Sequence, residues 1–146
     1  MNHDTTPFQD GQRYRVRSHL AVITLLTLGL LIGTAMFVGH SRGKHGIKAP
    51  AASGHPDFER AFRLQMNTHE AALAFLPTLW LAAHYWSALV AGLLGLMWVT
   101  ARVWYAIAYA RDAAWRGPAF IVAFLALAGL AATATAGVAR ATPTNG

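Results

Sequence analysis

The 146-residue sequence contains no cysteine and few charged residues. Without cysteine the chain forms neither a disulfide nor a thiolate metal site, and any thiol chemistry must use a thiol that the substrate brings. Charged residues make up only 12% of the chain and hydrophobic residues 55%, whereas a soluble domain is about one-quarter charged. This shortage of charge predicts that lipid, rather than water, surrounds most of the folded chain.

The charges that are present are mostly positive, giving a net charge of +6 at pH 7. In a soluble chain this excess would suggest nucleic-acid binding. Here the basic residues flank apolar segments, and no recognition-helix or zinc-finger spacing occurs. We therefore expect no nucleic-acid partner.

Four mainly apolar segments are each long enough to cross a bilayer, which takes about 20 residues. They cover residues 19–40, 58–85, 87–111 and 117–139, between a polar N-terminal tail at 1–18 and a C-terminal tail at 140–146. The connections between them are short, and Gly117-Pro118 is a strong stop and restart signal. The sequence therefore predicts an all-α integral membrane protein with a single domain, an antiparallel bundle of four transmembrane helices.

Basic residues are more numerous on one side of this predicted bundle than on the other. The side that bears the first and third connections holds Arg42, Lys44, Lys48, Arg60, Arg63, Arg111 and Arg116, and the opposite side holds Arg13, Arg15, Arg17 and Arg140. Because cytoplasmic loops carry the excess of Lys and Arg, the sequence predicts that these two connections are cytoplasmic.

Polar side chains occur at helical spacing inside the second and third segments. Arg63, Asn67 and Glu70 fall within a sector of about 60°, at about 100° per residue, so they face one direction. A second stripe follows in the third segment, provided that its helix continues through residue 116; it consists of Arg102, Tyr105, Tyr109, Asp112 and Arg116. A charged residue deep in a span costs about 2.5–3.5 kcal/mol on insertion scales, and such residues usually mark a site. We favour a polar ligand site over the alternative, in which the stripes only hold helices together.

The two stripes lie at matching depth in the predicted bundle. In an antiparallel pair, Glu70 and Arg102 are expected to meet inside the bundle, while Arg63, Arg111 and Arg116 face the cytoplasmic mouth. Cations above a buried polar floor suit a ligand that carries carboxylates.

Histidines are concentrated around the first connection, where a metal site has to be considered. His40, His45 and His55 lie in or beside a flexible loop without the paired spacing of a metal motif. We therefore predict no metal.

Two stretches, "FERAFRLQMNTHEAALAFLPTLWLA" and "ARVWYAIAYARDAAWR", resemble the MAPEG family, the membrane-associated proteins of eicosanoid and glutathione metabolism. The similarity is to the branch that contains leukotriene C4 synthase and microsomal glutathione transferases 2 and 3. It extends from about Arg42 to Arg116, and the fourth segment matches only in hydrophobicity. One position departs from the leukotriene-synthase branch: Ala71 stands where that branch has a glutathione-contacting tyrosine.

The resemblance implies a homotrimer of four-helix subunits that binds glutathione between neighbouring subunits. Matching positions assign glutathione binding to Arg42, Arg63, Gln65, Asn67, Glu70, Tyr105 and Tyr109, and the polar stripe of the third segment adds Arg102. Glu70 would receive the ammonium group of glutathione, and the arginines its carboxylates. Arg116 matches the arginine thought to stabilise the glutathione thiolate and is the predicted catalytic residue. A guanidinium beside a thiol lowers its pKa from about 8.5, which raises the nucleophilic fraction at neutral pH.

These expectations lead to one functional hypothesis and two alternatives. The hypothesis is a membrane glutathione transferase that joins glutathione to lipophilic electrophiles from the bilayer; the same thiolate would also support reduction of lipid hydroperoxides. The first alternative is a non-catalytic, lipid-binding scaffold of the same fold. The second is a small transporter, which the lack of an inverted-repeat signal disfavours.

Overall fold

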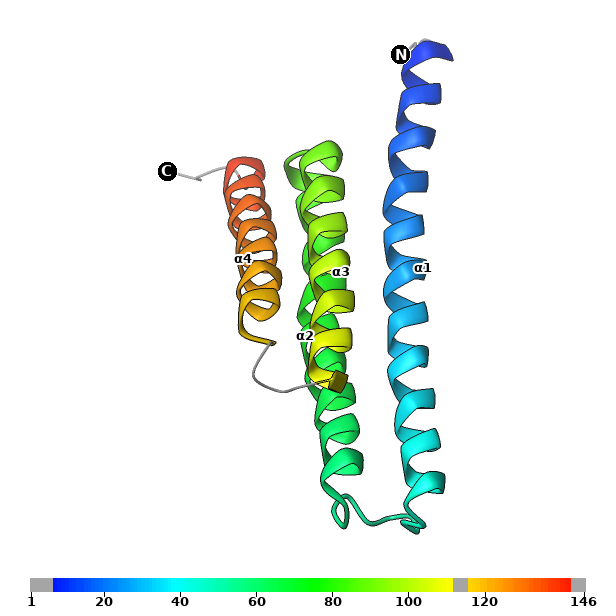
Figure 1. The fold of residues 1–146 in the computed structure, drawn as a ribbon. Coiled ribbons are helices and arrows are strands. Elements are labelled where there is room, and N and C mark those ends of the chain that lie inside the picture. The colour runs from blue at the N-terminus through cyan, green and yellow to red at the C-terminus, as the bar shows by residue number, and fades with distance from the viewer. Residues whose placement is uncertain (1–6, 112–115, 143–146) are drawn as a thin grey trace.

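The chain folds into an antiparallel bundle of four α-helices (Figure 1). The computed structural model describes residues 7–111 and 116–142, with side chains from residue 18 onward. The helices are α1 (Pro7–Lys44), α2 (Pro56–Tyr85), α3 (Ala88–Arg111) and α4 (Arg116–Ala141). The amino end of α1 and the carboxyl end of α4 lie at the same end of the bundle. The predicted all-α four-helix architecture is confirmed.

The first helix is longer than the sequence analysis predicted. It begins at Pro7, so residues 7–17, assigned above to a polar tail, form its first turns. Proline is favoured in the first turn of a helix, and the basic residues that follow are good helix formers. The remaining tail residues, 1–6 and 143–146, lie outside the described part of the chain.

Three of the helices are long and apolar enough to cross a membrane: Ser18–Lys44 within α1, all of α3 and all of α4. The first half of α2 carries several charged residues, and this lowers its hydropathy although its length of 30 residues would suffice. The chain is therefore a multi-pass integral membrane protein whose most polar helix packs against all three others.

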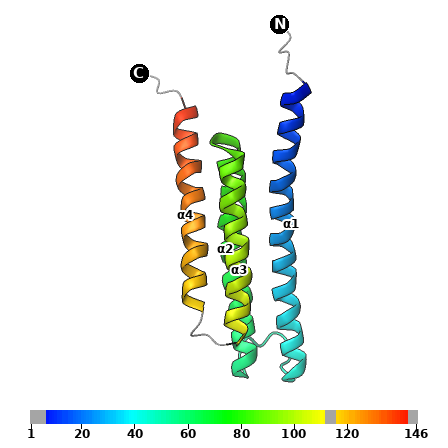
Figure 2. The same cartoon turned by 45° about the horizontal axis from the view of Figure 1, so that its top comes forward.

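The packing order explains where a polar site can form. Among the described residues, α1 and α4 each contact both α2 and α3 but not each other. Between the two central helices, Phe75 of α2 stacks on Trp98 of α3 with ring centroids 3.8 Å apart, and both side chains are buried. At the end where α3 stops and α4 begins, α1 and α2 continue further (Figures 1 and 2). Polar residues of α2 at this end therefore lie beside the termini of α3 and α4.

A close contact between α2 and α4 gives a first testable prediction. A Cβ atom at Gly137 would lie 2.6 Å from the backbone carbonyl oxygen of Tyr85, so the backbone would have to move. We expect Gly137→Ala to lower the free energy of unfolding by about 1–3 kcal/mol, measured in detergent. Gly129→Ala on the same helix is the control, because its Cβ would meet only the side chain of Leu94, at 3.3 Å. Equal losses in the two variants would contradict the described packing.

Candidate functional site

A pocket of about 430 Å³ lies between α2, α3 and the first turns of α4. It is lined by Arg63, Asn67, Tyr105, Tyr109, Arg116, Gly117 and Phe120. The first five of these residues were predicted from the sequence as site residues. The pocket thus combines two guanidinium groups, an amide and two phenols, which together suit a polar ligand with negative charge.

Hydrogen bonding and stacking fix the floor of this pocket. The side-chain amide of Asn67 donates to the hydroxyl of Tyr105 at 3.2 Å. The rings of Tyr105 and Tyr109, one helical turn apart on α3, stack with centroids 5.6 Å apart, and both residues are buried. Residues four apart lie on one face of a helix, so α3 presents the two phenols together.

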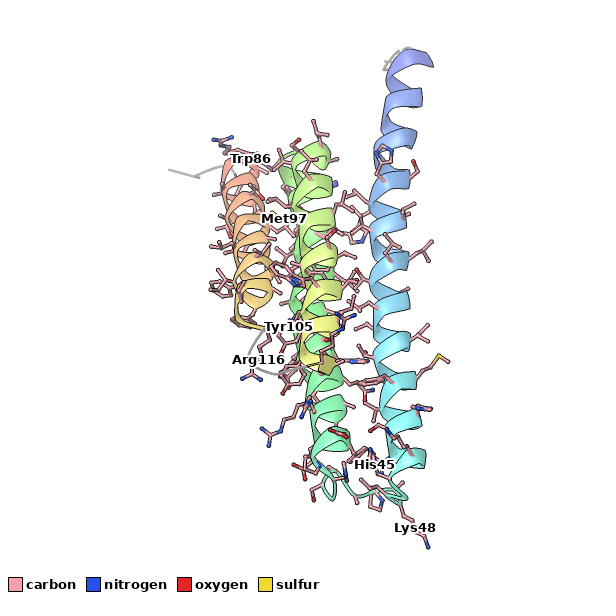
Figure 3. The ribbon with its side chains drawn as sticks, in the orientation of Figure 1. His45, Lys48, Trp86, Met97, Tyr105 and Arg116 are labelled. Carbon is pink, nitrogen blue, oxygen red and sulfur yellow. The ribbon has the colours of Figure 1, made fainter. Side chains whose placement is uncertain are left out.

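Arg116 reaches the pocket from a different element than expected. The stripe on the third segment assumed one helix through residue 116, but α3 ends at Arg111 and Arg116 is the first residue of α4. Its guanidinium carbon nevertheless lies 5.0 Å from the ring centroid of Tyr109. Figure 3 shows Arg116 and Tyr105 near the end of α3. Since Arg116 opens α4, the positive end of that helix dipole adds to its charge. Asp112, the other member of the stripe at this point, lies outside the described residues.

Arg102 lies behind the pocket rather than in its wall. Its side chain is only 2% exposed, and its Nη2 donates to the backbone carbonyl oxygen of Asn67 at 2.7 Å. The guanidinium carbon also lies 4.7 Å from the ring centroid of Tyr105, while Nε has no hydrogen-bond partner. Arg102 therefore contacts two residues of the pocket without lining it.

The expected meeting of Glu70 with Arg102 is not found. Among the described residues no ion pair joins them, and Glu70 is exposed. Burying both charges would cost several kcal/mol per ion before their attraction is counted. A neutral backbone carbonyl satisfies one donor of Arg102 without that second desolvation.

Besides Arg102, three predicted binding residues do not line the pocket of this chain. Glu70 is exposed, Gln65 is half-buried, and Arg42 lies at the end of α1. Arg42 donates to the backbone carbonyl oxygen of Ala51 at 2.9 Å and lies over the ring of Phe58 at 4.7 Å. The resemblance placed the site between neighbouring subunits, so the roles of these three residues stay predictions.

The sequence analysis missed two members of the pocket and one separate cluster. Gly117 and Phe120 line the pocket, yet nothing distinguishes them from other small or apolar residues of a membrane span. His45 and His55, placed above in a flexible loop without metal spacing, stack with ring centroids 3.7 Å apart. Partial burial lowers the pKa of His45, and the nearby His55 and Lys44 lower it further, whereas Asp57 acts in the opposite direction. The neutral imidazole of His45 therefore predominates at neutral pH.

Comparison with known protein families agrees with this architecture. Residues 20–136 match the model of the MAPEG family, so the match covers most of the chain and at least part of each of the four helices.

Individual relatives carry related names. Microsomal glutathione S-transferase 2 of Bos taurus is 36% identical over 119 residues, 82% of each chain. Leukotriene C4 synthase of Cavia porcellus is 37% identical over 119 residues, 82% of this chain and 79% of that protein. An uncharacterized protein of Synechocystis sp. is 43% identical over 89 residues, 61% of this chain and 65% of that protein. Because the family model matches most of this chain, and because these relatives are similar over most of their length, the chain belongs to the MAPEG family of integral membrane proteins.

Proposed function

We propose that this protein is a membrane glutathione transferase, which joins the thiolate of glutathione to lipophilic electrophiles. The observation that carries the proposal is the convergence of Arg63, Asn67, Tyr105, Tyr109 and Arg116 on one pocket. Its volume, about 430 Å³, lies within the range of about 300–1,000 Å³ that is usual for small-molecule sites. The names of the relatives, a glutathione S-transferase and a leukotriene C4 synthase, support the same activity.

Each polar group of the pocket has a partner on glutathione in this proposal. Arg63 binds a carboxylate, for which a guanidinium offers paired donors. Asn67 and the phenols of Tyr105 and Tyr109 hydrogen-bond the peptide groups. Glu70, which lies outside the pocket of one chain, receives the ammonium group.

The proposal also includes assembly as a homotrimer. In that assembly Arg42 and Gln65 complete the glutathione site from a neighbouring subunit, which accounts for their position outside the pocket of one chain. Arg102 holds Asn67 and Tyr105 in place from behind.

The chemical step needs only an activated thiol and access for the second substrate. The glutathione thiol releases its proton to water, and the guanidinium of Arg116 stabilises the thiolate that remains. The sulfur lone pair then forms a bond to the electrophilic carbon, whose leaving group departs with the electrons of the broken bond. Half-exposed Phe120 lies at the pocket and Phe124 one turn further along α4, so a lipophilic molecule can arrive from the bilayer.

The same thiolate supports a second reaction on lipid hydroperoxides. Its attack on the O–O bond gives an alcohol and a glutathione sulfenic acid, and a second glutathione converts the sulfenic acid to the disulfide with loss of water. The hydroperoxide is thereby reduced and two thiols are oxidised.

The activity test uses protein purified in detergent, with glutathione and a chloronitrobenzene-type electrophile. We expect enzyme-dependent formation of the thioether conjugate. Binding of glutathione without its consumption, with this electrophile and with a lipid hydroperoxide, would instead support the non-catalytic scaffold.

A matched pair of arginine variants tests the binding role of the pocket. Arg63→Ala should raise KM for glutathione by about tenfold to a hundredfold, because a hydrogen bond to a charged group is worth about 1.5–3 kcal/mol. Turnover at saturating glutathione should change less. Arg60→Ala is the control: Arg60 lies one turn away on α2, pairs with Asp57 at 3.8 Å and lines a different pocket. A similar KM in both variants would contradict the assignment of Arg63.

A further inference from the structure

The connection between α1 and α2 brings two imidazoles and a carboxylate together outside the glutathione pocket. Asp57 Oδ2 lies 3.9 Å from His45 Nε2 and also 3.9 Å from His55 Nδ1. One potential ligand atom from each of the three residues lies within 4.8 Å of the other two. Figure 3 shows His45 near the end of α1, far along the bundle from Trp86. We propose that His45, His55 and Asp57 form a binding site for a divalent transition-metal ion of the zinc class.

The spacing of the three atoms fits such an ion after a small contraction. With bonds of about 2.0–2.2 Å in a tetrahedral arrangement, two ligand atoms of zinc lie about 3.3–3.6 Å apart. The two nitrogen–oxygen distances are each 3.9 Å and exceed this by about 0.3–0.6 Å. The stacked rings must also turn so that both lone pairs aim at one point. His55 is 44% exposed and has room to rotate, whereas His45 is only 14% exposed and more firmly held.

The donor set selects the class of metal. Two imidazole nitrogens and one carboxylate oxygen suit zinc and its first-row neighbours, whereas calcium and magnesium prefer oxygen ligands alone. Asp57 is 56% exposed, so water can fill a fourth position. Arg60 lies 3.8 Å from Asp57 Oδ1, the other carboxylate oxygen, which leaves Oδ2 free for the ion.

Metal binding would replace one hydrogen bond that the cluster already makes. The backbone N–H of Asp57 donates to His55 Nδ1 at 3.2 Å, a capping bond at the start of α2. An ion on Nδ1 would replace that bond.

A bound ion would fix the connection that runs from α1 to α2. His45 follows directly after α1, while His55 caps α2 and Asp57 lies in its first turn. The backbone N–H of Ile47 and the side chain of Arg42 already tie the loop to the end of α1. The metal would add a link across the loop and thereby stabilise the folded state over the unfolded one.

Zinc titration of the whole chain tests this inference without glutathione, so its outcome does not depend on the proposed function. The chain is purified in detergent with any affinity tag removed and is titrated with Zn²⁺ by calorimetry. We expect about one ion per chain, weakened by more than about tenfold in His45→Ala and in His55→Ala. Asp57→Asn, which keeps the side-chain shape, should weaken binding as well.

His40→Ala is the matched control, because His40 lies on α1 beside the same cluster and contributes no atom to it. Zn²⁺ should raise the melting temperature of the wild type and of His40→Ala, but not that of the cluster variants. Co²⁺ should give the visible absorption of a tetrahedral site only in the first two proteins. Absence of Zn²⁺ binding by the wild type, or undiminished binding by His45→Ala and His55→Ala, would overturn the proposal.

Discussion

Replacing Arg116 by alanine is expected to lower turnover at neutral pH by about tenfold to a hundredfold, with a smaller change in KM for glutathione. Without the guanidinium, the pKa of the bound thiol returns toward its free value of about 8.5, so less thiolate is present at pH 7. The loss should therefore shrink as the pH rises, because the thiol then ionises without help. The measurements are the pH profile of turnover and the ultraviolet absorbance of the thiolate when glutathione binds.

Two companion variants sharpen this test. Arg116→Lys keeps a positive charge and should retain part of the turnover. Arg111 lies at the end of α3 and lines a different pocket. Arg111→Ala also removes a cation, but it should leave the pH profile of turnover unchanged. Wild-type turnover in Arg116→Ala, or a loss that does not depend on pH, would rule out thiolate stabilisation by Arg116.

Replacing Arg102 by leucine is expected to weaken glutathione binding although Arg102 does not line the pocket. The change removes the donor at 2.7 Å from the carbonyl oxygen of Asn67 and the cation that lies over the ring of Tyr105. Because this bond lies within the protein, only the loss of fixed positions for Asn67 and Tyr105 affects the ligand, so KM for glutathione should rise by about tenfold, equivalent to about 1.4 kcal/mol. Turnover at saturation should fall less, since Arg116 stays in place.

The melting temperature of the variant distinguishes a positioning role of Arg102 from a general loss of structure. Among the described residues Arg102 has no carboxylate partner, so removing its buried charge relieves a desolvation cost that offsets the lost hydrogen bond, and Arg102→Leu should keep a melting temperature near that of the wild type. Arg102→Lys can restore a donor toward Asn67 but lacks the planar group over Tyr105, so partial rescue is expected. If Arg102→Leu folds normally and its KM for glutathione is unchanged, Arg102 is not needed to hold Asn67 and Tyr105 in position.

Local periodicity was sufficient to predict the helices and most of the pocket. Long apolar runs located α3 and α4 to within a few residues, and the apolar second half of its segment located α2, because helix formation in a membrane depends mainly on segment length and hydropathy. Spacings of four residues brought Arg63 with Asn67 and Tyr105 with Tyr109, since such pairs share a helix face. The extension of α1 to Pro7 was missed because a polar helix lacks an apolar signal.

Contacts between different helices could not be predicted from periodicity. Arg102 was expected to meet Glu70, yet it bonds to the backbone of Asn67, and that choice depends on how α2 and α3 are rotated against each other. Arg116 was placed on the third helix but opens the fourth, and it still reaches Tyr109.

The sequence by itself determined that this chain is a membrane-spanning helical bundle with polar stripes on its second and third segments. Both properties follow from side chains that are neighbours along the chain, so no knowledge of folding was needed. Only the tertiary structure decided that Arg102 lies behind the pocket, that Arg116 enters it from α4, and that His45 meets His55 and Asp57. Those contacts join residues on different helices or on the two sides of a loop, and they are fixed by helix rotation and by the path of that loop, neither of which leaves a periodic signal.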